Sequence, residues 1–154
     1  MKRLLTLAVL LCLCLAACGR EVDVASVPRG KITLGEEAEA PQNIAKGVSL
    51  VVPAGGALPE KILCNLINEQ NSELTTEGKA FLQKKENGIW YAVEDGELDF
   101  TYWNDELLPG TYTQLRADWS ERWGALPRGT YRIVKEICVE GQGSCFLLAE
   151  FELP

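Results

Sequence analysis

The sequence predicts an all-β fold, an antiparallel β-sandwich of about seven short strands over residues 47–154. Two observations lead to this prediction. Short runs in which apolar and polar residues alternate recur along this part of the chain, and Gly, Pro and Asn residues separate them at intervals typical of strand connections. The region also has about the size of one domain, which is enough to bury a single core without a metal or a cofactor.

The candidate strands follow one another in order. In the first, Val48, Leu50 and Val52 alternate with Ser49 and Val51. A break with two prolines and a Gly-Gly pair follows at residues 53–59. The remaining candidates are residues 61–68, 80–85, 89–93, 98–103, 111–119, 130–139 and 145–153.

Two connections have the composition of tight hairpins. Asn87 and Gly88 lie between two strand-like runs, and an Asn-Gly pair in that position is the strongest short-range hairpin signal. The last two candidate strands are joined by Glu-Gly-Gln-Gly at residues 140–143. We therefore expect antiparallel pairing on both sides of these turns.

The peptide that leads into residues 130–139 narrows the class of sandwich. It reads Leu-Pro-Arg-Gly-Thr-Tyr and ends at Tyr131, at the start of a strand. Sandwiches of the immunoglobulin type place a tyrosine corner there, in which the hydroxyl group bonds back to upstream backbone. Two residues further on, Ile133 replaces the cysteine of antibody domains, so their disulfide between the sheets is not expected.

Four segments carry a resemblance to a known family. They read FLQKKENGIWY at 81–91, DWS at 118–120, GALPRGTYRIVKE at 124–136 and AEFEL at 149–153. These segments resemble the bacterial immunoglobulin-like domain that is common in lipoproteins and secreted proteins of Gram-positive bacteria. The resemblance extends over nearly all of residues 47–154. It implies a seven-stranded sandwich on a surface-anchored chain, and it supplies no catalytic residues.

The N-terminal residues have the layout of a signal peptide. Lys2 and Arg3 precede an apolar run over residues 4–16, which is too short to span a membrane. Leu-Ala-Ala at residues 15–17 before Cys18 resembles the lipobox of bacterial lipoproteins. The resemblance implies cleavage of residues 1–17 and a diacylglyceryl group on Cys18; an ordinary secretory signal remains the alternative. The expected location is the extracytoplasmic face of the cell membrane, with the lipid as the anchor.

Between Cys18 and the sandwich, residues 18–46 are rich in Glu, Ala and Gly, and we expect a flexible acidic tether. Without Lys2 and Arg3, 13 basic residues remain against 22 acidic ones, for a net charge of −9. This charge disfavours nucleic acid as a partner, and it leaves contact with the membrane to the lipid alone. The chain has no histidine, which removes the commonest general base and metal ligand, and we expect no enzyme activity.

Three cysteines remain in the domain, namely Cys64, Cys138 and Cys145. A two-residue turn would place Cys138 opposite Cys145 in a disulfide, whereas a three-residue turn would place them on opposite faces. A bulge at Lys135, which interrupts the inward row of this strand, could turn Cys138 inward. The sequence is therefore compatible with a Cys138–Cys145 disulfide and with two free thiols. Cys64 is expected to be a free core thiol, and no metal site or cofactor is predicted.

The candidate binding surface consists of two adjacent aromatic pairs, Trp90-Tyr91 and Tyr102-Trp103. One ring of each pair should leave the core, because neighbours on a strand point to opposite faces. The alternative is that these rings only cover a sheet edge. We therefore expect a monomeric, non-catalytic protein-binding or envelope-assembly module whose partner is another envelope protein. A domain that binds cell-wall glycan or other carbohydrate through these aromatics is the alternative.

Overall fold

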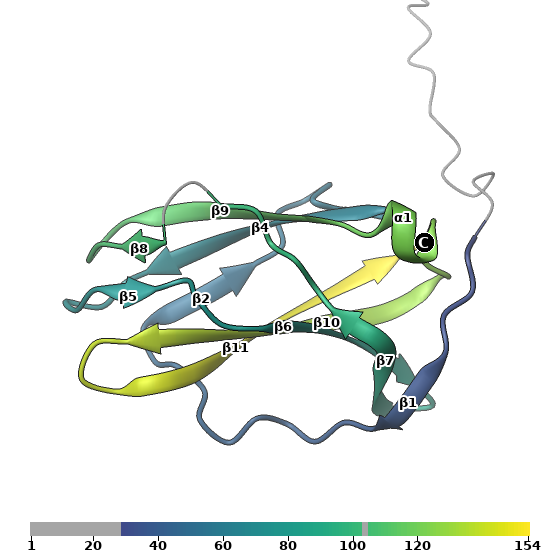
Figure 1. Cartoon of the computed structure of the whole chain (residues 1–154), viewed down its shortest axis with the longest axis horizontal. Helices are drawn as coiled ribbons and strands as arrows, with labels where there is room; N and C mark the ends of the chain where they lie inside the picture. Colours follow the sequence, from purple (N-terminus) through teal and green to yellow (C-terminus); the bar gives the residue numbers. More distant parts are fainter. Residues whose placement is uncertain (1–28, 103–104) are drawn as a thin grey trace, which may run out of the picture.

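The computed structural model describes residues 29–102 and 105–154 and confirms the predicted fold class, because two antiparallel sheets pack face to face in a β-sandwich (Figure 1). The expected signal peptide, Cys18 and Trp103 lie outside these residues. Within residues 29–102 and 105–154, none of the helices has the length and apolar character needed to cross a membrane.

The larger sheet has seven strands, of which four follow the order β1-β7-β6-β10. Strand β11 pairs with the opposite edge of β10. Strand β5 pairs with β10 on the same edge as β6, beyond the end of β6, and β8 pairs with β5. The strands of this sheet are β1 (Leu34–Glu37), β5 (Leu74–Thr75), β6 (Ala80–Glu86), β7 (Ile89–Glu97), β8 (Glu106–Leu107), β10 (Gly129–Val139) and β11 (Gly143–Leu153). The smaller sheet has four, β2 (Val48–Val51), β3 (Ala57–Leu58), β4 (Lys61–Asn68) and β9 (Tyr112–Asp118). A single helical turn, α1 (Ser120–Trp123), follows β9. In the candidate strand at residues 98–103, the described residues 98–102 form no strand, and Thr101 forms an isolated bridge with Arg116.

The predicted hairpin at Asn87-Gly88 is present between β6 and β7. Both residues have positive φ angles, 52° and 86°, as a two-residue turn of type I′ requires. The second hairpin joins β10 to β11 in unbroken register from Gly129↔Leu153 to Val139↔Gly143. Alternate residues of these two strands face the other sheet, where they form the core.

The tyrosine corner is also confirmed. The Tyr131 hydroxyl group donates a hydrogen bond of 2.7 Å to the carbonyl oxygen of Pro127, four residues upstream. The ring is fully buried and stacks on Phe151, with 5.6 Å between the ring centroids. Burial of the hydroxyl group raises the pKa of Tyr131. This contact fixes the entry into β10, the strand with pairs on both sides.

Part of the expected tether is ordered on the sandwich instead of extending freely. Residues 34–37 form β1, which pairs with β7. The backbone of Ala38 then donates to Trp90 in β7, and residues 43–45 exchange two backbone hydrogen bonds with Phe146 in β11. Residues 38–45, here called the crossing segment, thus join the two sides of the larger sheet.

The span of the crossing segment agrees with a path over the outer face of that sheet. Strands β7 and β11 are three strand spacings apart, about 14 Å. The five Cα-to-Cα steps from residue 38 to residue 43 reach at most about 17 Å when extended. Figure 1 shows this chain passing below the larger sheet, on the side away from the smaller sheet. On this outer face, Arg132 and Val134 of β10 are only 5% exposed.

The disulfide between Cys138 and Cys145 is not formed, and the pleat is the reason. Cys145 pairs with Ile137, so Cys138 lies one residue out of register and on the opposite face. Cys138 is accordingly exposed, whereas Cys145 is buried, and both thiols are free. Cys64 is a buried free thiol, as expected, and desolvation raises its pKa to about 12.

The bulge considered at Lys135 is also absent, since the β10–β11 register runs through this position without a shift. Lys135 instead points into the protein and is 2% exposed. Its Nζ donates to the carbonyl oxygens of Thr76 (2.7 Å), Gly78 (2.7 Å) and Glu136 (2.8 Å). Burial lowers the pKa of Lys135 to about 8. These bonds hold the turn that connects β5 to β6 against β10.

Candidate functional site

Trp90, the first residue of the predicted aromatic surface, is half-buried on the outer face of the larger sheet. The Arg132 guanidinium lies 4.4 Å from the centroid of its ring, and the Lys85 ammonium lies 5.2 Å from it. Two cations near one aromatic ring are favourable for the fold, because both are attracted to the ring quadrupole. Trp90 is therefore engaged by its own chain, although part of the ring remains exposed.

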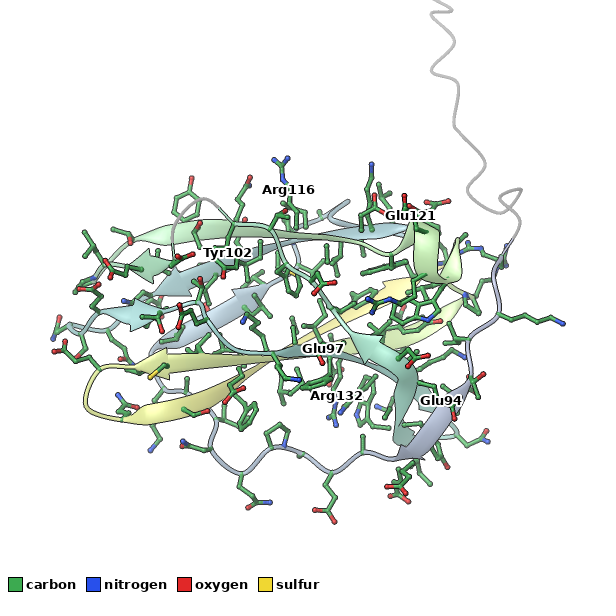
Figure 2. All side chains as sticks on the ribbon, viewed as in Figure 1. Glu94, Glu97, Tyr102, Arg116, Glu121 and Arg132 are labelled. Atoms are coloured by element: carbon green, nitrogen blue, oxygen red, sulfur yellow. The ribbon has the colours of Figure 1, made fainter. Side chains whose placement is uncertain are left out.

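Tyr91 and Tyr102 do not extend this surface. Tyr91 pairs with Lys84 on the inward row of the larger sheet and is half-buried. Tyr102 lies next to the bridge between Thr101 and Arg116 and packs against the core from the side of β9. Figure 2 shows Tyr102 well separated from Arg132, which contacts Trp90. The described members of the predicted surface thus lie on different sheets and form no continuous patch.

The two sheets differ in what covers their outer faces. The crossing segment covers part of the larger sheet, as described above. The outer face of the smaller sheet, here called the open face, is solvent-exposed or half-buried. Its outward side chains are Ser49, Val51, Leu58, Lys61, Leu63, Asn65, Ile67, Tyr112, Gln114, Arg116 and Asp118.

Large apolar side chains are prominent on the open face. Tyr112 is 67% exposed, Val51 is 43% exposed and Leu58 is 39% exposed. A hollow of about 530 Å³ lies over Leu58, Leu63 and Arg116 and is bordered by Asp99 and Thr101. A second hollow, of about 300 Å³, lies between Tyr102 and Gln114 and shares Thr101 and Arg116 with the first. The two hollows together form a trough across the strands.

The carboxylates beside the trough are engaged within the chain. Asp118 accepts hydrogen bonds from the backbone amide (2.9 Å) and the hydroxyl group (2.5 Å) of Ser120, and these bonds lower its pKa. Asp99 lies 3.6 Å from a guanidinium nitrogen of Arg122. Arg116 differs, because its exposed guanidinium has no hydrogen bond or ion pair with any residue in the described ranges. Figure 2 shows it projecting away from β9.

Sequence reasoning did not single out Arg116 or Tyr112. The alternation of residues 112–118 does indicate which side chains face outward, since Thr113, Leu115 and Ala117 are buried. It does not indicate which sheet face stays open, because that depends on the path of residues 38–45. Trp119, which follows β9, packs in the core, and its indole NH donates to the carbonyl oxygen of Pro59 (2.7 Å).

The described ranges hold no group of three His, Cys, Asp or Glu side chains that could bind a metal ion. The acidic residues of β7 lie instead around Arg122. Its guanidinium donates to the carbonyl oxygens of Asp95 (2.9 Å) and Glu97. Backbone oxygens of β7 and the carboxylate of Asp99 thus both lie against Arg122, and the Glu97 carboxylate pairs with Lys79 (3.0 Å).

The two antiparallel sheets and the tyrosine corner define an immunoglobulin-like β-sandwich. The model of the bacterial Ig-like domain family matches residues 52–152, and the chain belongs to this family.

Comparison with solved structures finds the archaellum periplasmic stator protein FlaG from Sulfolobus acidocaldarius. It shares 12% sequence identity with this chain at a TM-score of 0.43, and the match covers 68% of this chain and 99% of FlaG. A similarity of this size carries no inference about function. No curated protein matches the sequence.

Proposed function

We propose that this chain is a membrane-anchored extracytoplasmic lipoprotein whose bacterial Ig-like domain acts as a non-catalytic protein-binding or envelope-assembly module. The observation that carries the anchoring is the run Leu-Ala-Ala-Cys at residues 15–18, behind a basic pair and a short apolar segment. A lipid on Cys18 would hold the domain at the membrane, where the acidic protein surface itself has little affinity.

The binding role rests on the surface of the domain. The open face presents exposed apolar side chains and an unpaired guanidinium, which are features that protein interfaces use. The glycan alternative receives less support, because Trp90 is engaged by Arg132 and Lys85 and is separated from Tyr102. The absence of histidine from the sequence supports a role without catalysis.

Cross-linking on intact bacteria tests this function. Cells that express the full chain are treated with a membrane-impermeant, amine-reactive cross-linker, and captured proteins are identified by mass spectrometry. We expect one defined envelope protein with the wild-type chain and a loss of that product with Cys18→Ala, which removes the lipid acceptor. Capture of no protein above background by the wild-type chain would contradict a protein-binding role.

A further inference from the structure

The open face carries a cation that the fold does not use. The Arg116 backbone exchanges two hydrogen bonds with Thr101, whereas its side chain has no partner in the described part of the chain. Removing the guanidinium should therefore cost the fold little. An exposed, unpaired arginine above apolar side chains is a common anchor of protein interfaces.

The charge of this face differs from that of the whole chain. The chain has a net charge of −7, yet the carboxylates beside the trough are already bound by Ser120 and Arg122. Lys61 lies on the same face, next to Asp118. Arg116 is the cation that lines both hollows, so it is the charge best placed to meet a ligand in the trough. Complementarity requires a carboxylate or another anion at this position.

The shape of the face favours an elongated ligand. The two hollows meet at Thr101 and Arg116, so the trough continues on both sides of the guanidinium. Leu58 and Leu63 line one side of it, and Tyr102 and Gln114 line the other. An extended peptide could place a carboxylate at the centre and apolar side chains along the trough, because its side chains alternate with a period of two.

We propose that the open face docks an extended segment of a partner protein in which an acidic residue lies next to apolar ones. Its carboxylate pairs with Arg116, and its apolar side chains contact Leu58, Leu63 and Tyr112. This inference rests on the proposed protein-binding function and adds the surface and the chemistry of the partner. On the larger sheet, Trp90 already contacts Arg132 and Lys85, and the crossing segment bonds to the backbone of β7 and β11.

Site-specific photo-cross-linking in cells tests the proposal. The full chain is expressed in the bacterium with benzoylphenylalanine at Tyr112, and in a second strain at the exposed Glu36 of β1 as a control position. The cross-linked peptides are then sequenced by mass spectrometry. We expect the Tyr112 position alone to react, with one protein segment that contains Asp or Glu next to apolar residues.

The role of the charge is tested by Arg116→Glu in the Tyr112 probe strain. A central interface arginine contributes strongly to affinity, so its loss should lower the cross-linking yield by at least about tenfold. Arg128→Glu is the matched control, because Arg128 is also exposed and undergoes the same charge change. It should leave the yield unchanged. Both variants should unfold at the wild-type temperature, which separates loss of binding from loss of the fold.

Each other result has a definite meaning. A segment without carboxylates, a lipid or a glycan at the Tyr112 probe would overturn the proposal, as would equal yields with Arg116→Glu and Arg128→Glu. Reaction only at Glu36, or capture by the amine-reactive reagent without reaction at Tyr112, would overturn the proposal but leave the protein-binding function intact. No capture by either method would contradict both.

Discussion

The hydroxyl group of Tyr131 provides a single contact whose contribution to the fold can be measured. Its bond to the Pro127 carbonyl lies in a buried corner, so Tyr131→Phe leaves that oxygen without a partner. We expect the free energy of unfolding to fall by about 1 to 2 kcal/mol in urea, with an unchanged m-value. Tyr112→Phe is the control, because Tyr112 is 67% exposed, and it should have no effect.

Lys135 predicts a pH dependence of stability with a definite sign. Its pKa is lowered from 10.5 to about 8 by burial, so between these values the unfolded chain binds more protons than the folded one. Stability contributed by this group therefore rises with pH from 8 to 10.5. Cys64 acts in the opposite direction above pH 9, because burial raises its pKa from 9.0 to about 12.

A comparison with Lys135→Met isolates the lysine, since Cys64 is present in both proteins. The free energy of unfolding of the wild type minus that of the variant should increase as the pH is raised from 8 to 10. Urea titrations at pH 7, 8, 9 and 10 measure it. A difference that stays constant with pH would show that Lys135 keeps an ordinary pKa in the folded protein.

The β6–β7 hairpin shows how a short turn fixes the pairing of two strands. Gly88 has a φ angle of 86° and no atom within 4 Å of the place a Cβ would take, so Gly88→Ala introduces backbone strain without a clash. We expect a loss of about 1 kcal/mol in the free energy of unfolding. Gly35→Ala in β1 should cost less, because Gly35 has no positive φ angle and its Cβ would meet ordinary contacts of 3.6 Å.

The N-terminal part of the described chain should contribute to stability. Ala45 is buried, and Ile32 and Leu34 pack against the core, so a protein of residues 47–154 lacks these contacts and those of the crossing segment. We expect its free energy of unfolding to be about 2 to 3 kcal/mol lower than that of residues 29–154. Equal urea midpoints would mean that residues 29–46 behave as a tether after all.

Local signals predicted the elements that depend on local geometry. The Asn87-Gly88 turn and the Tyr131 corner follow from residue types whose backbone angles or hydrogen bonds act within a few positions. The ordered conformation of residues 34–45 could not be predicted. It depends on hydrogen bonds to β7 and β11, and both strands are distant in sequence. The cysteine pairing depended on a register difference of one residue, which the turn composition alone does not determine.

The whole molecule is a sandwich with two unlike outer faces. On the larger sheet the crossing segment bonds to the Trp90 backbone and the Trp90 ring contacts Arg132, while the smaller sheet keeps apolar residues and Arg116 exposed. This asymmetry explains why the predicted aromatic surface and the trough lie in different places. In the lipid-anchored module that we propose, the open face is therefore the one that a partner would bind.

The central claim is that this domain is anchored through a lipid on Cys18, and the intact mass of the mature protein tests it most directly. The chain is expressed in a bacterium, extracted from the membrane fraction in detergent and analysed by mass spectrometry. We predict a protein that begins at Cys18 and carries the added mass of a diacylglyceryl group. An unmodified chain that begins at Cys18 or at another residue, recovered without detergent, would contradict the anchor.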